Sequence, residues 1–326
     1  MACSKPRLSV KMMDGKVDEG ESALSVGPEM YTPEWLLGFG SPEEYAEFLR
    51  TRGKALRPRL RRALQLADLR PGMRVLDLGC GKGEVTFHAA LAGAEAYGLD
   101  YSSGSLSLSR KTFEVLPRSA RKHAFLIQAD VKAIPLADEA FDRIFVLDLV
   151  EHLYDWELRL ALREFFRLLR PEGYVIVHTL PNRWALNIGY HLARTFLRSL
   201  PPSPRNEYER VVHVNEQDVI RLHDSLSACG FASRIWLEGT TKEQAAWQGG
   251  GDRFSDMRRE AYPIFTNSVL GGIYTALVRS PARLIFANDI YAIAWRAGQP
   301  PPLILSRSDC RGLTERVSIS IARRLR

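Results

Sequence analysis

The chain has 326 residues, of which 45% are hydrophobic and 25% are charged, and its formal net charge is +7. This length and composition are enough for one large buried core with an added subdomain. The cysteines are too scattered for a metal motif or a close disulfide pair, which indicates free thiols in a reducing compartment. They are Cys3, Cys80, Cys229 and Cys310. No apolar signal core follows the first basic residues, so we expect a cytoplasmic protein.

The N-terminal region divides into two parts. Residues 1–30 mix charges with Gly and Ser without periodicity, which predicts a poorly ordered leader. Residues 31–69 are expected to form a helical cap. A possible N-cap at Ser41, followed by a proline and two acids, is typical of a helix start, and a second, basic helix is expected over 58–67.

A glycine-rich turn then follows a buried strand. Residues 75–78 are an apolar run typical of a central parallel strand, and glycines stand at positions 79, 81 and 83. Glycine tolerates positive φ and lets a ligand approach the backbone, and a helix is expected over 84–91. The next strand, 94–99, ends at Asp100, where doubly wound folds place a carboxylate that binds ribose hydroxyls. The stretch therefore predicts a nucleoside pocket.

The spacing of the glycines distinguishes two cofactor classes. A dinucleotide-binding fold expects G-x-G-x-x-G, whereas this chain has G-x-G-x-G preceded by Asp77. A carboxylate would repel a pyrophosphate, but it suits a cationic ligand such as S-adenosylmethionine. The motif therefore favours S-adenosylmethionine over a nicotinamide cofactor.

Acids follow three consecutive predicted strands. Asp100 ends the second strand, Asp130 follows a third strand over 125–128, and Asp148 follows a fourth strand over 144–147. In an open parallel sheet the carboxyl ends of the strands form the edge where ligands bind. We therefore expect these acids to border one site.

The second half of the chain should complete the sheet. We expect an amphipathic helix over 156–169, a buried strand over 175–179, an inserted helix over 185–200, a helix around Val219 to Leu226, a strand from Phe231 to Leu237, and a final antiparallel strand over 284–295. The loop after the fifth predicted strand is the best candidate for acceptor specificity. It supplies Pro181, Asn182 and Trp184.

The last insertion and the tail raise the question of membrane contact. Residues 261–278 lack charge but contain proline, glycine and polar residues, and a span there would separate two strands that must pair. We expect a helical lid instead, with peripheral membrane contact left open for 261–278 or for the basic tail, 296–326. The tail carries seven arginines and two acids, without any RNA-binding module, so no nucleic-acid partner is expected.

Together these motifs resemble the class I S-adenosylmethionine-dependent methyltransferases, especially the small-molecule branch that includes quinone-biosynthesis O- and C-methyltransferases. The resemblance is carried by DLGCGKG at 77–83, Asp100, ADV at 129–131, FD at 141–142, VEHL at 150–153 and LRPEGY at 169–174. It implies an α/β fold with a Rossmann-like, seven-stranded, mostly parallel sheet, helices on both faces, an N-terminal helical cap and a helical insertion before the last strand. The methyltransferase domain would cover 70–295, with insertions at about 184–212 and 239–283.

The resemblance also implies roles for residues. The methionine part of the cofactor would lie against Asp77, Gly79, Gly81 and Gly83, the ribose against Asp100, the adenine against Asp130 and Val131, and the sulfonium side against Asp148, with Cys80, Tyr101 and Leu149 as further cofactor neighbours. Helices before the first strand often cover the cofactor, which would place Tyr31 and Trp35 near the acceptor.

Candidate bases or acceptor contacts are His152 and His213, whereas His178 is a less favoured base and is expected in the core or in the pocket wall. No metal is expected, because no extra acidic cluster lies beside Asp148. The implied reaction is methyl transfer to a small-molecule acceptor, which could be apolar and hydroxylated, lipid-like or a glycan precursor. The alternative is a catalytically silent scaffold or regulatory protein that binds the cofactor and uses the lid and the basic tail to hold a partner.

Overall fold

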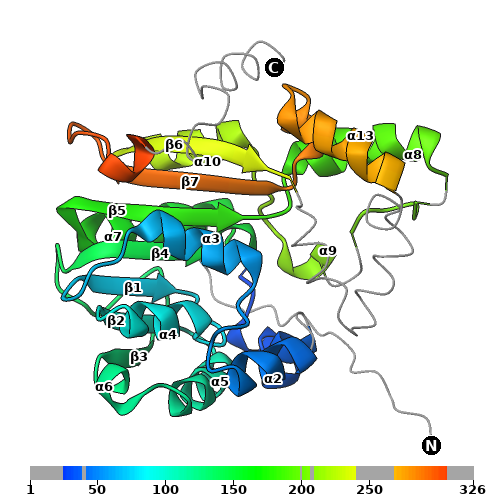
Figure 1. Ribbon diagram of the computed structural model, residues 1–326. Coiled ribbons are helices and arrows are strands. Elements are labelled where there is room, and N and C mark those ends of the chain that lie inside the picture. Colours follow the sequence, from blue (N-terminus) through cyan, green and yellow to red (C-terminus); the bar gives the residue numbers. More distant parts are fainter. Residues whose placement is uncertain (1–24, 39–41, 199, 206–208, 240–267, 307–326) are drawn as a thin grey trace, which may run out of the picture.

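The computed structural model describes residues 25–38, 42–198, 200–205, 209–239 and 268–306. Its centre is one seven-stranded sheet in the order β3-β2-β1-β4-β5-β7-β6 (Figure 1). The strands are β1 Arg74–Leu78, β2 Glu95–Asp100, β3 Ala124–Gln128, β4 Phe141–Leu147, β5 Leu169–Thr179, β6 Phe231–Glu238 and β7 Asp289–Arg296. The first five pair in parallel, and β7 is antiparallel to both of its neighbours. The predicted fold is confirmed.

Helices cover both faces of the sheet. In chain order the helical segments are η1 Pro28–Met30, α1 Pro33–Gly38, α2 Pro42–Arg50, α3 Pro58–Ala67, α4 Glu84–Leu91, α5 Ser103–Glu114, α6 Arg118–Arg121, η2 Val150–His152, α7 Asp155–Leu168, η3 Ala185–Gly189, α8 Tyr190–Phe196, α9 Glu209–Val212, α10 Val219–Ala228, α13 Ser268–Arg279, α14 Arg283–Phe286 and η4 Leu303–Ser306. The predicted helical character of the cap is therefore present in α1, α2 and α3.

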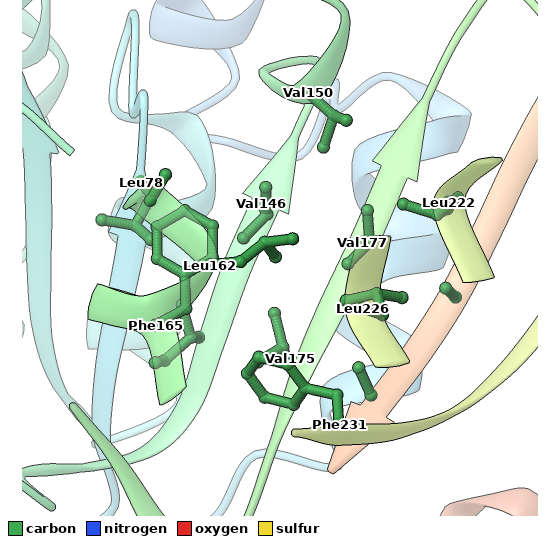
Figure 2. Close-up of a cluster of buried hydrophobic side chains, with 14 of the residues drawn as sticks. Leu78, Val146, Val150, Leu162, Phe165, Val175, Val177, Leu222, Leu226 and Phe231 are labelled. Atoms are coloured by element: carbon green, nitrogen blue, oxygen red, sulfur yellow. The ribbon is translucent and has the colours of Figure 1, made fainter. Parts of the chain in front are cut away.

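Successive side chains of the central strands point to opposite faces of the sheet, and each face has its own hydrophobic core. In β4, Ile144 and Val146 face one core and Phe145 faces the other, because successive side chains of a strand point to opposite faces. The first core lies against α7 and α10, and Figure 2 shows Leu162 of α7 and Leu222 of α10 meeting side chains of the sheet. Burial of both faces explains why these strands read as continuous apolar runs in the sequence.

The cap is anchored to the sheet layer by side chains. Phe48 of α2 is fully buried and lies edge-to-face with Phe87 of α4, with 5.3 Å between ring centroids. The hydroxyl of Tyr45 donates to the carbonyl oxygen of Leu108 at 2.8 Å. The hydroxyl of Tyr174 in β5 donates to the carbonyl oxygen of Leu66 in α3, also at 2.8 Å. These contacts fix the cap against the core on the side of the sheet that α4 covers.

Several predicted boundaries need correction. The last strand begins at Asp289 rather than at residue 284, because residues 283–286 form α14. The inserted helix after β5 starts with a π-helical turn, η3, and ends at Phe196. The leader was predicted to extend to residue 30, but η1 covers 28–30 and the hydroxyl of Tyr101 donates to the carbonyl oxygen of Val26 at 3.0 Å.

The insertion before β7 is described only in part. Its described helix, α13, confirms helical structure at 268–279, whereas the predictions for 1–24, 240–267 and 307–326 fall outside the described residues. Among the described helices, none has the length and apolarity needed to cross a bilayer. Peripheral membrane contact through 261–278 or the tail stays a prediction.

The contact between η3 and α14 leaves no room for a side chain at Gly189. A Cβ placed there would lie 1.6 Å from the carbonyl oxygen of Ile285, which is backbone and cannot move aside cheaply. We expect Gly189→Ala to lower the free energy of unfolding by at least about 1–3 kcal/mol, as overpacking does. Urea denaturation monitored by circular dichroism measures this change.

Gly272 in α13 is the matched control. A Cβ there meets nothing within 4 Å, so Gly272→Ala should leave the protein as stable or make it about 0.5–1 kcal/mol more stable. Equal stability of Gly189→Ala and the unchanged protein would show that η3 and α14 do not approach each other as described.

Candidate active site

The glycine turn after β1 opens onto a cavity. Gly79 and Gly81 have φ values of +64° and +52°, a region that disfavours residues with a Cβ. A Cβ at Gly81 would have only the carbonyl oxygen of Gly79 nearby, at 3.9 Å, so this backbone faces open space. Gly83 differs from the prediction. It does not line the cavity, and its added Cβ would lie 2.9 Å from Ser109 Oγ, which makes it a helix-packing residue.

Asp77 is a buried acid at the end of β1. Its side chain accepts hydrogen bonds from the Thr86 hydroxyl at 2.7 Å and from the Thr86 backbone amide at 3.2 Å. Burial raises the pKa of Asp77 to about 7, and these hydrogen bonds only partly oppose the shift. Asp77 lines the cavity, so a cationic ligand there would favour its ionised form.

Asp100 ties the turn to the second strand. One carboxylate oxygen accepts from the Gly81 amide at 3.0 Å and the other from the Ser102 amide at 2.9 Å. Burial raises the pKa of Asp100, while the backbone donors oppose that effect. Asp100 also borders the cavity, so it can hold the turn and present its carboxylate to the hydroxyls of a ribose.

Asp130 and Val131 follow β3 at the same edge. Asp130 accepts from the Lys132 backbone amide at 2.9 Å, and its other oxygen lies 2.9 Å from Lys132 Nζ. The same ammonium lies 2.8 Å from an oxygen of Glu157. Asp130, Val131, Lys132 and Glu157 all border the cavity. The predicted pair is therefore placed where expected, with a lysine already beside its acid.

Asp148 belongs to a charge network rather than standing free. It has a φ of +53°, and its oxygens lie 2.5 Å from His178 Nδ1 and 2.8 Å from Arg59 Nε. The second nitrogen of His178 lies 3.0 Å from an oxygen of Asp289. Burial alone would raise the pKa of Asp148, but the charges of Arg59 and His178 outweigh it and hold that pKa below its ordinary value.

His178 is deeply buried within this network, as its predicted core role requires. Burial by itself lowers the pKa of a histidine, but the carboxylates of Asp148 and Asp289 raise that of His178 to about 9. Because Arg59 comes from α3, the network also links the cap to the carboxyl end of β4.

The two candidate histidines lie together at the cavity wall. The rings of His152 and His213 are perpendicular, with 5.0 Å between centroids. His152 Nδ1 lies 3.1 Å from the hydroxyl of Tyr31. Burial, followed by the charge of His213, lowers the pKa of His152 to about 3. His152 is therefore neutral near pH 7. Both histidines border the cavity, and their role as bases or acceptor contacts stays a prediction.

Aromatic residues of the cap close over this edge. The Tyr31 ring lies 4.9 Å from Trp35, 5.7 Å from Tyr101 and 5.7 Å from His152, measured between centroids. The carbonyl oxygen of Tyr31 also accepts from the Ser102 hydroxyl at 2.8 Å. Tyr31 thus bridges the end of β2 and the loop after β4.

These groups enclose one cavity of about 280 Å³. Its wall includes predicted site residues from the cap and from every strand end named above. They are Tyr31, Trp35, Asp77, Gly79, Cys80, Gly81, Asp100, Tyr101, Asp130, Val131, Asp148, Leu149, His152 and His213.

The loop after β5 does not supply the acceptor contacts that its position suggested. Of the stretch 180–184, only Leu180 borders the cavity. Asn182 is fully buried, and its amide nitrogen donates to the carbonyl oxygens of Leu284 and Ala287 at 2.9 and 2.8 Å. Trp184 packs against the core, and Pro181 lies outside the cavity wall. The physical reason is that Asn182 of this loop turns away from the cavity and binds the backbone of α14 and the residue that follows it.

Several charged residues of the wall were not predicted, among them Glu151, Lys82 and Arg59. Glu151 is buried; burial and then the charge of Asp148 raise its pKa to about 8. Lys82 sits between the glycines; burial lowers its pKa to about 8 while Glu84 opposes the shift. Arg59 has no motif around it, so only the fold reveals it. Glu151 and Lys82 could have been suspected from their places beside His152 and within the glycine turn.

The chemical groups that line the cavity suit S-adenosylmethionine. A buried acid with a raised pKa complements a cation, an acid at the end of β2 retains acceptor capacity for hydroxyls, and left-handed glycines leave the backbone open between them. Val131 and Leu149 add apolar wall. The residues that would hold this cofactor are thus those of the turn and the strand ends.

Comparison with known proteins also indicates a methyltransferase domain. A family model described as a methyltransferase domain matches residues 76–177. A demethylmenaquinone methyltransferase from Corynebacterium efficiens is 27% identical over 168 residues, which cover 52% of this chain and 66% of that protein. A ubiquinone biosynthesis O-methyltransferase from Alkalilimnicola ehrlichii is 30% identical over 149 residues, which cover 45% and 58%. The chain thus spans less than two thirds of the length of either relative.

Among solved structures, phosphoethanolamine N-methyltransferase 2 of Haemonchus contortus, in complex with S-adenosyl-L-methionine, matches with a TM-score of 0.50. The match has 16% identity and covers 82% of this chain and 58% of that one, so it shows a shared fold. With the sheet order and the acid-lined glycine turn, these matches show that the chain contains a methyltransferase domain, matched over residues 76–177, and shares the fold of that S-adenosylmethionine-bound structure.

Proposed function

We propose that this protein transfers a methyl group from S-adenosylmethionine to a small, apolar, hydroxylated acceptor. The observation that carries the proposal is the composition of the single cavity described above. Acids and open backbone from the sheet edge face the same space as a cluster of aromatic and histidine side chains. Such a space can hold a cationic donor and an apolar acceptor together.

The cofactor half would be bound by the turn and the strand ends. When bound, S-adenosylmethionine supplies a methyl group on a positively charged sulfur. Asp77 offers the negative charge that complements the ligand's cationic end, and Asp100 offers acceptor capacity to the ribose. Because the leaving thioether is neutral, the protein needs no acid for it, and positioning supplies most of the rate.

The acceptor half would be bound by the cap and the loop after β4. Tyr31, held between Tyr101 and His152, closes the cavity and excludes water from the reacting groups. His152 and His213 offer polar atoms to a hydroxyl on the acceptor. Apolar side chains also border the cavity near these elements, and they are Leu36, Leu60, Leu149, Leu153 and Leu180.

An apolar ring or chain that bears a hydroxyl would match both the apolar side chains of the wall and the polar atoms of the two histidines. The names of the relatives support this class, since they refer to demethylmenaquinone and to ubiquinone biosynthesis. Lipid-like hydroxylated compounds and glycan precursors with an apolar carrier belong to the same chemical class. A catalytically silent scaffold would bind the cofactor without consuming it, and turnover distinguishes the two.

The ribose contact can be tested at Asp100. We expect Asp100→Ala to weaken binding of S-adenosylmethionine and S-adenosylhomocysteine by at least about tenfold, or 1.4 kcal/mol, because it removes a charge-assisted hydrogen bond and releases Gly81. Isothermal titration calorimetry measures both affinities. Asp100→Asn, which keeps one acceptor oxygen, should lose less than the alanine variant. Unchanged affinity in Asp100→Ala would remove the ribose assignment.

The charge at Asp77 predicts a pH dependence of cofactor binding. Its pKa of about 7 means that raising the pH from 6 to 8 ionises the side chain and strengthens its attraction for a cation. We expect the dissociation constant of S-adenosylmethionine to fall by up to about tenfold over this range, relative to the same titration with Asp77→Asn. The ligand's own titration is common to both proteins, so parallel pH profiles would contradict the role of Asp77.

Turnover tests the acceptor class. With a panel of apolar phenols and naphthoquinols, we expect acceptor-dependent formation of S-adenosylhomocysteine, measured by liquid chromatography and mass spectrometry. Trp35→Ala should raise KM for the acceptor about tenfold through loss of an aromatic contact. Phe196→Ala truncates an aromatic ring that is 86% exposed and outside the cavity, so it should leave KM unchanged. Cofactor binding without turnover on any acceptor would favour the scaffold.

A further inference from the structure

Three potential metal ligands meet at the cavity wall. Glu151, His152 and His213 each offer one ligand atom, and these atoms all lie within 4.8 Å of one another. Glu151 and His152 belong to η2, directly after β4, whereas His213 follows α9, about sixty residues later in the chain. All three border the cavity described above. The cluster is therefore a product of the fold and not of a local sequence motif.

The protein holds this cluster in place through its surroundings. Glu151 Oε2 accepts from the Thr179 hydroxyl at 2.7 Å, and the Glu151 carbonyl oxygen accepts from the Asn215 amide at 3.0 Å. The second contact binds the segment around His213 directly to η2. His152 is in turn oriented by the hydroxyl of Tyr31, 3.1 Å from Nδ1. Ligands fixed by such neighbours are typical of metal sites in proteins.

The donor set favours a particular kind of cation. Two imidazoles and one carboxylate suit divalent transition metals such as zinc, manganese or iron, whereas magnesium prefers oxygen ligands. Metal bonds of about 2.1 Å would draw the three atoms closer together by side-chain rotation. Three protein ligands leave coordination positions for a substrate oxygen, as in catalytic sites.

Asp148 does not extend this set, although it precedes Glu151 by only three residues. Its two oxygens are engaged by His178 and Arg59. The expectation of no metal rested on the lack of an acidic cluster beside Asp148. Because His213 comes from a distant segment, no sequence pattern around Asp148 reveals this set.

We propose that Glu151, His152 and His213 bind a divalent transition-metal cation that coordinates a hydroxyl oxygen of the methyl acceptor. The role in catalysis rests on the proposed methyl transfer, whereas the binding of the cation does not. A cation at an acceptor hydroxyl lowers the pKa of that hydroxyl and orients its oxygen. The reaction forms the acceptor O–CH₃ bond and breaks the S–CH₃ bond; the sulfur keeps the electron pair, and the hydroxyl proton passes to water.

Metal binding is tested without turnover. Chelator-treated full-length protein is titrated calorimetrically with Zn²⁺ and, in separate experiments, with Mn²⁺ and Mg²⁺. We expect one Zn²⁺ or Mn²⁺ per chain with a dissociation constant below about 10 μM, and much weaker binding of Mg²⁺. Glu151→Gln and His213→Ala should each weaken Zn²⁺ binding at least about tenfold. No saturable binding of Zn²⁺ or Mn²⁺ would overturn the proposal.

Two controls make the result specific. His223→Ala removes a histidine on α10 that does not border the cavity, so it should leave Zn²⁺ affinity unchanged. Glu151→Gln keeps the shape of the side chain and an oxygen that can accept from Thr179, which provides a folded variant if His213→Ala fails to fold. Equal loss of affinity in His223→Ala, or no loss in both cluster variants, would place the metal elsewhere and overturn the proposal.

Cofactor binding, measured on the same samples, separates this inference from the proposed function. Binding of S-adenosylmethionine without metal binding would refute the metal site and leave the methyltransferase function standing. Metal binding without cofactor binding would support the site and refute the function. If both hold, added Zn²⁺ or Mn²⁺ should stimulate turnover of hydroxylated acceptors by at least about tenfold in the unchanged protein and not in Glu151→Gln.

Discussion

The site depends on carboxyl groups that the fold withdraws from water at one edge of the sheet. A buried charge is costly unless donors or cations surround it, and the acids of this edge meet that requirement differently. Asp100 has two backbone amides and Asp148 has Arg59 and His178. Asp77 has hydrogen bonds from Thr86 but keeps a raised pKa of about 7. A cationic ligand would relieve this last cost, which is why the cavity is complementary to a sulfonium donor.

Residues of the site also help to hold the cap to the sheet. Arg59 of α3 pairs with Asp148, and Tyr31 contacts His152 through its hydroxyl and Ser102 through its carbonyl oxygen. The contacts that hold the cap over the cavity therefore also orient its polar groups. A cap bound only by apolar contacts could close without fixing these charged groups, whereas ion pairs and hydrogen bonds require defined geometry.

The cavity also joins segments with different chemistry. The sheet edge supplies acids and open backbone, the cap supplies aromatic rings, and the stretch after α9 supplies His213 beside Glu151 and His152. Figure 1 shows α9 and α2 on the right of the view, the side to which the arrows of β1 and β5 point. The donor and the acceptor would thus be bound by separate parts of the chain that meet only in the folded protein.

The fold and the cofactor half were readable from the sequence because they depend on local patterns. The apolar runs at 75–78 and 144–147, the glycines at 79 and 81, and the acid at 100 can each be recognised from the residues beside them in the chain. Boundaries were less accurate where tertiary contacts override local preference. The apolar start of the expected last strand forms α14 instead, because Asn182 binds its carbonyl oxygens.

The sequence by itself therefore determined the fold class, the turn, and the acids at the strand ends, including Asp77, Asp100 and Asp148. Only the tertiary structure decided what meets across long separations. It turned Asn182 into the core, paired Asp148 with Arg59, and brought His213 to Glu151 and His152. The reason is physical: periodicity and glycine geometry are properties of neighbouring residues, whereas burial, charge pairing and ligand clusters depend on distances that exist only once the sheet, its cap and its insertions have packed together.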